Sequence, residues 1–313
     1  MKLIVQVPCH NEAETLGLVL ATIPKSIKGI DIIETLIIDD GCTDGTADIA
    51  RSLGVNHIVT HKRNRGLARS FRDGANRALE LGADIVVNTD GDNQYPSAKI
   101  GDLVKPIIDG TADIVIADRQ TQTIAHFSPF KKFLQRFGTG IVNSVADTNV
   151  PDAASGFRAY SKESLLELNT ISSFSYAMES IIQAGNRRLA IASIPITTNP
   201  KTRESRLFKS MGEHVVRSGV AIMRAYFMYK PYILFNSIGL LLLLVGLSPF
   251  VRYGLLVLAD DKGNHLQSLI IGAVLLISAL LFFVLGVMAD LIRINRILHE
   301  EALEQIKRER FKS

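Results

Sequence analysis

Cysteine is scarce in this sequence: Cys9 and Cys42 are the only two among 313 residues. Their spacing matches no cysteine-based metal motif, and so few thiols fit a reducing compartment. We assign neither of them a redox role. A large excess of charge of one sign is also lacking, because the formal net charge is only +4 at pH 7. Such a small excess is a weak signal for nucleic acid, and we expect no nucleic-acid partner.

Charged residues are absent from two long stretches, residues 231–251 and 268–289. A helix of roughly 20 residues, at about 1.5 Å rise per residue, covers the ~30 Å hydrocarbon core of a bilayer. Each stretch is long enough for one crossing, and residues 252–267 form a short polar connection. The sequence therefore predicts a membrane hairpin over residues 231–291. The alternative, two helices buried in a large soluble core, is disfavoured by the length of both stretches.

We also expect no secretory signal, because the apolar run at residues 3–7 is too short for one. Only Arg252 and Lys262 carry positive charge between the two apolar stretches. The basic residues after the second stretch are Arg293, Arg296, Lys307, Arg308, Arg310 and Lys312. Because positive charge concentrates on the cytoplasmic side and is attracted to anionic headgroups, we expect a multi-pass protein of the cell (inner) membrane. The N-terminal domain and both termini would lie in the cytoplasm.

Short β-branched runs alternate with helix-length segments in the first part of the chain. The runs are residues 3–7, 32–38, 57–60, 85–88 and 114–117. This alternation predicts an α/β fold with a mostly parallel, Rossmann-like sheet and crossover helices. Later segments complete a domain over residues 1–204: a basic helix at 130–146, a strand at 157–160, a helix at 176–188 and a strand at 190–196.

Beyond this domain, the pattern changes twice before the chain ends. Residues 205–230 have apolar side chains at helical spacing among basic ones, which predicts an interfacial amphipathic helix on the bilayer. An ordinary packing helix has the same pattern, and the two alternatives stay open. After the hairpin, residues 292–313 form a charged helical tail, which we expect to be solvated.

A glycine-rich turn is missing after the first strand, which excludes a dinucleotide-binding domain of the dehydrogenase kind. The strand ends are acidic instead: Glu12 follows the first strand, Asp39 and Asp40 the second, and Asp90 and Asp92 the fourth. The ligand crevice of an open parallel sheet lies at these carboxyl ends. Carboxylates there would repel a diphosphate unless a divalent cation lay between them. The Asp-x-Asp pair therefore predicts a Mg²⁺ or Mn²⁺ site.

Five motifs follow one another in the sequence: Pro-x-x-Asn-Glu, Asp-Asp-Gly-x-Thr-Asp-Gly-Thr, Asn-x-Gly, Asp-x-Asp and Ser-Gly-Phe-Arg. Over residues 3–206 this series resembles glycosyltransferase family 2, in the branch of dolichyl-phosphate mannose synthases and bacterial polyprenyl-phosphate glycosyltransferases. The resemblance implies a fold of the GT-A type. It also implies a nucleotide sugar donor, either GDP-mannose or a UDP-hexose, a polyprenyl or dolichyl phosphate acceptor, and a metal-dependent, inverting transfer.

The same resemblance implies roles for individual residues. The expected contacts of the nucleotide sugar are Pro8, Asn11, Glu12, Asp39, Asp40, Asn64, Gly66, Asp90 and Gly91. The expected metal ligands are Asp90, Asp92 and Gln94, and the expected catalytic residues are Asp92, Arg119 and Asp152. The expected contacts of the acceptor phosphate are Lys131, Lys132, Arg136, Ser155, Arg158, Lys201, Arg203 and Arg206. Solvated basic faces or headgroup attraction are the alternative for the basic residues of this last set.

Two roles are open for Asp152, which precedes Ser-Gly-Phe-Arg and matches a candidate base. A phosphate monoester has a second pKa of about 6, so the acceptor is already a nucleophile at neutral pH and needs no strong base. Asp152 is therefore either a catalytic base or a group that orients the acceptor or Arg158.

Two further functions compete with lipid-phosphate glycosylation. A processive polysaccharide synthase would carry a Gln-x-x-Arg-Trp motif, and the chain has no Trp. The second alternative is a catalytically silent membrane scaffold that binds nucleotide sugars. The presence of Asp90, Asp92 and Arg119 argues against it. The sequence leaves open the donor's sugar and base, the length of the lipid, and whether the chain forms a homo-oligomer.

Overall fold

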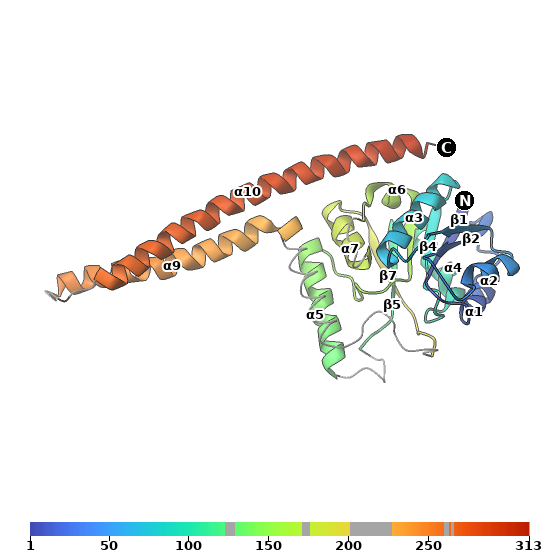
Figure 1. Cartoon of the computed structure of the whole chain (residues 1–313), viewed down its shortest axis with the longest axis horizontal. Coiled ribbons are helices and arrows are strands. Elements are labelled where there is room, and N and C mark those ends of the chain that lie inside the picture. The colour runs from blue at the N-terminus through green and yellow to red at the C-terminus, as the bar shows by residue number, and fades with distance from the viewer. Residues whose placement is uncertain (123–128, 171–175, 201–226, 260–262, 264–265, 313) are drawn as a thin grey trace. The chain divides into compact units, whose positions relative to one another are not determined.

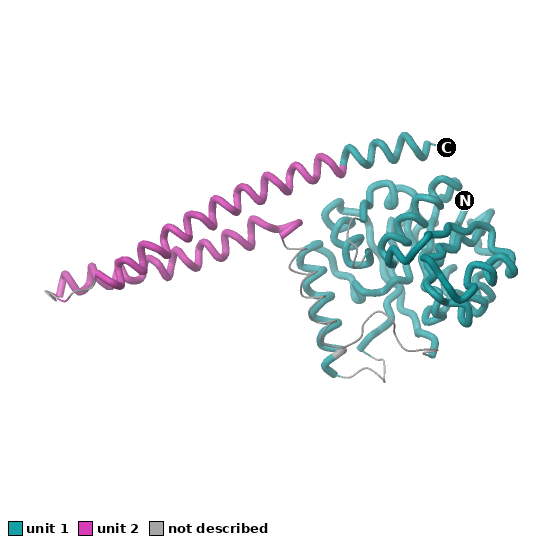
Figure 2. Tube along the Cα trace, viewed as in Figure 1, with its two compact units in different colours: residues 1–222, 301–313 teal, residues 223–300 magenta. Residues whose placement is uncertain are grey.

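The computed structural model describes the chain except for residues 123–128, 171–175, 201–226, 260–262, 264–265 and 313. The chain divides into two compact units (Figure 2). The first unit contains Met1–Ile222 together with Glu301–Ser313, and the second contains Met223–Glu300. The polypeptide therefore leaves the first unit, forms the second, and returns to the first with its last residues.

The first unit is built on one sheet of seven strands among the described residues, in the order β3-β2-β1-β4-β6-β5-β7. Figure 1 labels β1, β2, β4, β5 and β7 of this sheet. The strands are β1 (Lys2–Cys9), β2 (Ile32–Asp39), β3 (His57–Thr60), β4 (Ile85–Asn88), β5 (Ile114–Asp118), β6 (Arg158–Ser161) and β7 (Ile191–Pro195). All neighbours pair in parallel except β6, which is antiparallel to β4 and to β5. The predicted mostly parallel α/β sheet is confirmed.

Helices connect these strands and cover the sheet. They are α1 (Leu16–Thr22), α2 (Thr46–Ser52), α3 (Leu67–Glu80), α4 (Ile100–Ile108), α5 (Pro129–Ala146), α6 (Lys162–Glu167) and α7 (Tyr176–Asn186), with a 3₁₀ turn η1 (Ser97–Lys99) before α4. The predicted helices at residues 130–146 and 176–188 correspond to α5 and α7.

Both faces of the central strand β1 are buried. Leu3, Val5 and Val7 belong to one core cluster that includes residues of α1 and α4. On the opposite face, α3 approaches so closely that a Cβ added to Gly74 would lie 2.6 Å from Oε1 of Gln6. Parallel strands covered on both faces need apolar residues at successive positions, not only at alternate ones. This requirement explains the continuous β-branched runs in the sequence.

The antiparallel strand β6 positions the Ser-Gly-Phe-Arg segment. Its first residue, Arg158, pairs with Asn88, the last residue of β4. Because the two strands run in opposite directions, the start of β6 lies at the carboxyl end of β4. The loop before β6 therefore lies beside Asp90, which follows β4 by two residues.

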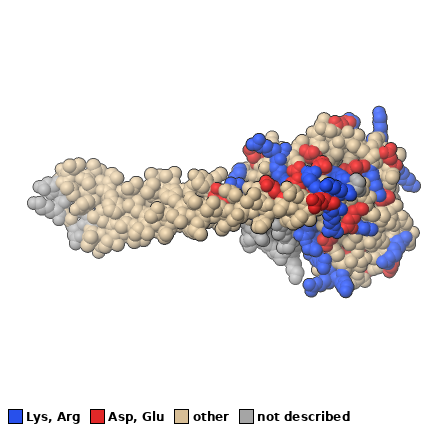
Figure 3. Space-filling model, turned by 90° about the horizontal axis from the view of Figure 1, so that it is seen from above, with Lys and Arg blue, Asp and Glu red and all other residues tan. Residues whose placement is uncertain are grey.

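The second unit contains two long helices, α9 (Pro231–Leu258) and α10, which begins in this unit and covers Leu266–Arg310. Both are long and apolar enough to cross a membrane, and both predicted apolar stretches lie within them. Charged side chains are concentrated on the first unit, whereas the helix surface in Figure 3 is almost uncharged. Small residues allow close packing: a Cβ on Gly246 would lie 3.2 Å from the carbonyl oxygen of Gly272.

The charged tail is the end of α10, and most of its residues are exposed, but its last turns are also held by the first unit. Helix α10 continues without a break to Arg310, and its last turns belong to the first unit. There Lys307 Nζ donates to the carbonyl oxygens of Leu165 and Leu168, and Arg308 donates to Glu163 at 2.6 Å. The tail is thus attached to α6, because carbonyl groups at the end of that helix accept from a lysine. The expected interfacial helix at 205–230 lies almost entirely outside the described residues.

Candidate active site

Two carboxylates lie at the carboxyl end of β4. The Oδ1 atom of Asp90 is buried and has no hydrogen-bond partner in the part of the chain that the structure describes. The pKa of Asp90 is raised to about 7. Burial is the largest cause, the negative charge of Asp92 is the second, and Arg119 partly opposes the shift. Asp92 accepts a hydrogen bond from the backbone N–H of Gln94 at 3.0 Å. An ionised Asp90 therefore needs a positive charge beside it.

A divalent cation fits this requirement. Carboxylate oxygens are the ligands that Mg²⁺ and Mn²⁺ prefer, and a cation would stabilise the ionised form of Asp90. Within the described ranges, no group of three or more His, Cys, Asp or Glu side chains has the geometry of a complete metal site. Two aspartates would leave coordination positions for oxygens of a ligand, as expected where a cation bridges protein and diphosphate.

Arg119 and Asp152 form a nearly buried ion pair close to Asp90. Arg119 donates to Asp152 from Nε at 2.7 Å and from Nη2 at 2.9 Å, and the backbone N–H of Arg119 adds a third bond at 3.3 Å. Burial alone would raise the pKa of Asp152, but the hydrogen bonds and charge of Arg119 hold it below its usual value. A carboxylate with a lowered pKa is a weak proton acceptor at neutral pH. The geometry favours the orienting role, with Arg119 and not Arg158 as the group that Asp152 orients.

Arg158 does not reach a ligand site, so our expectation that it contacts the acceptor phosphate is wrong. Its side chain is completely buried. The guanidinium donates to the carbonyl oxygens of Ala153, Ser155 and Ala177 and to the hydroxyl of Ser180. These bonds fasten the loop before β6 to α7. Ser155 is also fully buried, and its hydroxyl has no partner among the described side chains and backbone.

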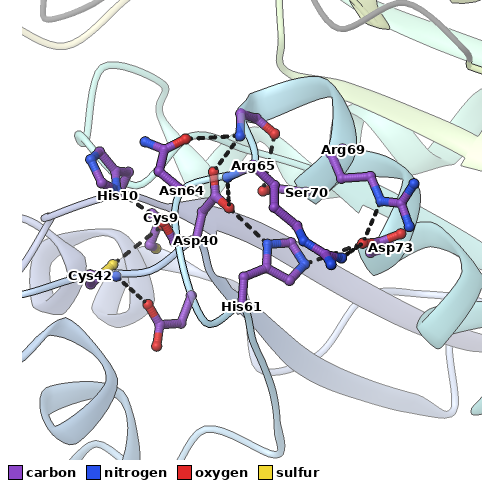
Figure 4. A network of polar contacts seen from close by, with 12 residues as sticks. Cys9, His10, Asp40, Cys42, His61, Asn64, Arg65, Arg69, Ser70 and Asp73 are labelled. Atoms are coloured by element: carbon purple, nitrogen blue, oxygen red, sulfur yellow. Dashed lines mark hydrogen bonds and ion pairs between the residues drawn. The ribbon is translucent and has the colours of Figure 1, made fainter.

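Asp40 organises the segment that follows β3 (Figure 4). Its carboxylate accepts from Nδ1 of His61 at 2.7 Å and from the backbone N–H groups of Arg65 and Gly66, each at 2.8 Å. Asn64 also accepts from Gly66, at 2.9 Å. The expected donor-binding residues Asp40, Asn64 and Gly66 are therefore brought together in one network.

Glycine is required at position 41 by this arrangement. Gly41 has φ +68°, and a Cβ there would lie 2.6 Å from the carbonyl carbon of Arg63 and 2.7 Å from the backbone nitrogen of Asn64. A side chain at this position would push the segment after β3 away from β2. The glycine of the Asp-Asp-Gly motif thus keeps the Asp40 network closed.

Side chains also connect the ends of β1, β2 and β4. Asn11 Oδ1 accepts from the backbone N–H of Thr43 at 2.8 Å, and Asp39 accepts from that of Cys42 at the same distance. The hydroxyl of Thr15 donates to the carbonyl oxygen of Gly91 at 2.7 Å and lies 3.2 Å from Oε2 of Glu12. Pro8 lies in β1, next to these loops. The expected donor-binding residues therefore converge at one edge of the sheet.

The expected acceptor-phosphate residues are only partly described. Lys132 and Arg136 lie on α5, where Lys132 Nζ donates to the carbonyl oxygen of Gln122 at 2.8 Å and Arg136 is exposed. The side chain of Lys131 lies outside the described part of the structure, as do residues Lys201, Arg203 and Arg206.

Three residues that sequence reasoning missed surround Gly156 in the Ser-Gly-Phe-Arg motif: Asn88, Tyr95 and Tyr176. Tyr95 follows Gln94 directly, so its place beside the Asp-x-Asp motif was a signal that could have been used. Asn88 ends β4, which was a similar signal. Tyr176 offers no local pattern, because it lies at the start of α7, 20 residues after Gly156.

Comparison with known proteins shows the family of the chain. The family model "Glycosyl transferase family 2" matches residues 4–168. The chain belongs to this family. It is therefore a glycosyltransferase, as the order of its motifs predicted.

Among its relatives, the undecaprenyl-phosphate mannosyltransferase of Micrococcus luteus is 26% identical over 207 residues, which cover 63% of this chain and 83% of the relative. Glycosyltransferase AglJ of Haloferax volcanii is 26% identical over 311 residues, 96% of this chain and 95% of the relative. Glucosyl-3-phosphoglycerate synthase from Mycobacterium tuberculosis, solved with Mn²⁺, UDP and glucosyl-3-phosphoglycerate, has a TM-score of 0.53 at 21% identity. That match covers 71% of this chain and 79% of the solved one, and it confirms the expected GT-A type of fold.

Proposed function

We propose that this glycosyltransferase moves a sugar from a nucleotide diphosphate sugar onto a polyprenyl or dolichyl phosphate at the cytoplasmic membrane face, with inversion and with Mg²⁺ or Mn²⁺. One observation carries the proposal. A chain with the donor-site carboxylates of family 2 at its sheet edge also has two helices of membrane-crossing length. An acceptor that resides in the bilayer explains both features.

The donor half rests on the electrostatics of Asp90, Asp92 and Arg119. Asp90 and Asp92 would hold a divalent cation, which would supply positive charge for the diphosphate and for the leaving nucleoside diphosphate. Asp152 holds Arg119 through its two side-chain hydrogen bonds, so that the guanidinium is fixed before the donor binds. The M. tuberculosis synthase was solved in complex with Mn²⁺ and UDP, which supports a divalent cation at the nucleotide site proposed here.

The acceptor half rests on the membrane helices and on α5. The M. luteus relative is named for an undecaprenyl phosphate substrate. Helix α5 exposes Phe130, Phe133 and Phe137, and the basic Lys132 and Arg136 alternate with them. Aromatic and basic side chains in alternation suit the interface between lipid tails and headgroups. Residues Lys131, Lys201, Arg203 and Arg206 extend the proposed phosphate contacts, and the basic residues after the second apolar stretch support cytoplasmic termini.

The proposed transfer is one displacement. An oxygen of the acceptor phosphate attacks the anomeric carbon, and the bond from this carbon to the diphosphate oxygen breaks with its electron pair leaving on the nucleoside diphosphate. At neutral pH most of the acceptor phosphate has already lost its second proton. No proton needs to be removed by the protein, which agrees with an Asp152 held ionised by Arg119.

The test is a screen with the purified full chain in lipid nanodiscs. GDP- and UDP-sugars are combined with a short polyprenyl phosphate and Mn²⁺ or Mg²⁺, and lipid-linked sugar is measured by mass spectrometry. We expect one donor to give product with the wild type and none with Asp92→Ala. Donor binding without a lipid product from any polyprenyl phosphate would overturn the proposal in favour of a silent scaffold.

A further inference from the structure

Gly156 is held on both sides of its peptide backbone by buried polar side chains. Its N–H donates to the hydroxyl of Tyr95 at 3.0 Å. Its carbonyl oxygen accepts from Nδ2 of Asn88 at 2.9 Å and from the hydroxyl of Tyr176 at 3.2 Å. Asn88 also donates to the Tyr176 hydroxyl at 2.8 Å. We call Asn88, Tyr95 and Tyr176 the Gly156 bracket.

The bracket lies directly against the candidate metal site. A Cβ added to Gly156 would be 3.0 Å from the Tyr176 hydroxyl and 3.3 Å from each carboxylate oxygen of Asp90. The backbone of Gly156 therefore forms the wall next to the Asp90 carboxylate. Any movement of this wall changes the space around Asp90.

Packing makes the bracket rigid. The Tyr176 ring stacks on Phe71 with centroids 4.2 Å apart, and the Tyr95 ring stacks on Phe157 at 5.4 Å. Both tyrosines are at most 3% exposed. Burial, followed by the negative charge of Asp90, raises the pKa of Tyr176 well above its usual value, so its hydroxyl remains a hydrogen-bond donor.

The same loop carries the second half of the site. Asp152 precedes Gly156 by four residues and holds Arg119. Arg158 follows Gly156 by two residues and fastens the loop to α7 through the carbonyl oxygen of Ala177, the residue after Tyr176. The bracket is thus the point at which the loop is fixed relative to Asp90, between the ion pair on one side and β6 on the other.

We propose that Tyr176 and Asn88 are positioning residues of the transfer: they fix Gly156 and thereby set the Asp152–Arg119 pair relative to Asp90. This inference rests on the proposed function. Misplacement of reacting groups by a fraction of an ångström lowers the rate without necessarily weakening substrate binding. The two residues act through the loop and do not touch the substrate themselves.

The test compares Tyr176→Phe with Tyr160→Phe. Both substitutions remove one buried hydroxyl from a ring that lies against Phe71, but the Tyr160 hydroxyl has no hydrogen-bond partner among the residues described. We expect Tyr176→Phe to lower kcat about tenfold, the effect of losing one hydrogen bond that is needed in the transition state. The donor KM, measured at saturating Mn²⁺, should stay within about twofold of wild type, and Tyr160→Phe should retain wild-type kcat and KM.

A second measurement does not depend on turnover. Titration of Mn²⁺ by electron paramagnetic resonance, with nucleoside diphosphate present, should give a several-fold weaker Kd for Tyr176→Phe and an unchanged Kd for Tyr160→Phe. Wild-type kcat in Tyr176→Phe, or equal losses in both variants with equally lowered melting temperatures, would overturn the positioning role. If the wild type transfers no sugar to any lipid phosphate, the proposed function fails, and the Mn²⁺ titration alone decides for or against the bracket.

Discussion

Replacing Asp152 by asparagine distinguishes a base from an orienting group, because it removes the charge and keeps the shape. In the structure this carboxylate is 1% exposed and receives two hydrogen bonds from the side chain of Arg119, at 2.7 and 2.9 Å. Removing one partner of a buried ion pair costs about 3–5 kcal/mol, largely because the other charge stays buried and unpaired. If about 3–4 kcal/mol of this cost is added to the activation free energy, kcat/KM falls roughly 10²- to 10³-fold.

The role of Asp152 is then determined by a double-mutant cycle with Arg119→Ala. If Asp152 acts only by holding Arg119, the double variant should be at most about tenfold worse than the worse single variant, because both remove the same interaction. A base that works independently of Arg119 would make the two losses multiply, to about 10⁴-fold or more. The assay is initial transfer of radiolabelled sugar to polyprenyl phosphate, and multiplied losses would refute the orienting role.

The pH profile provides an independent check on the same pair. The pKa of Asp152 is lowered in the folded protein, so the pair stabilises the fold above the ordinary carboxyl pKa and loses this effect as pH falls through the lowered value. Asp152 should therefore cause no rise or fall of kcat/KM between pH 5 and 8. The pH profiles of wild type and Asp152→Asn should have the same shape in this range. As a matched control, Asp102→Asn removes an exposed pair with Lys99 and should leave activity and stability nearly unchanged.

Three further outcomes follow from the site and its support. Asp92→Ala should abolish turnover and Mn²⁺-dependent donor binding while the melting temperature stays near that of wild type; full activity would contradict the metal assignment. Lys132→Gln combined with Arg136→Gln should raise the KM for polyprenyl phosphate several-fold and leave the donor KM almost unchanged. Both constants are measured by varying each substrate in turn. An unchanged acceptor KM would assign both residues to a solvated face. Arg158→Met should destabilise the protein by about 3 kcal/mol or more, because it leaves buried carbonyl groups unpaired. Thermal unfolding measures this loss. A raised acceptor KM without destabilisation would instead support the predicted phosphate contact of Arg158.

The local patterns of the sequence predicted the fold class well. The five β-branched runs became β1 to β5, and the next two predicted strands became β6 and β7 within one or two residues. Both uncharged stretches became α9 and α10. Such elements are readable because their periodicity and length depend on neighbouring residues along the chain. What sequence periodicity did not show is the antiparallel insertion of β6 between β4 and β5.

The candidate site was predicted unevenly. Asp90 and Asp92 were predicted at one edge of the sheet because the strand ends of a parallel sheet meet there, and the family motifs marked the remaining expected donor residues. Arg158 was misjudged because its motif gives no information about which way the side chain points. Tyr176 was missed because no local pattern distinguishes it from any other tyrosine at the start of a helix.

Composition and order along the chain determined an α/β domain with acidic strand ends, followed by a membrane-length hairpin. Only the tertiary structure decided that Asp152 holds Arg119, that Arg158 is buried, and that Tyr176 contacts the backbone of Gly156. The physical reason is that a polar group's role depends on the partners that replace its water. Those partners come from strands and helices that are distant in sequence and meet only when the sheet is assembled.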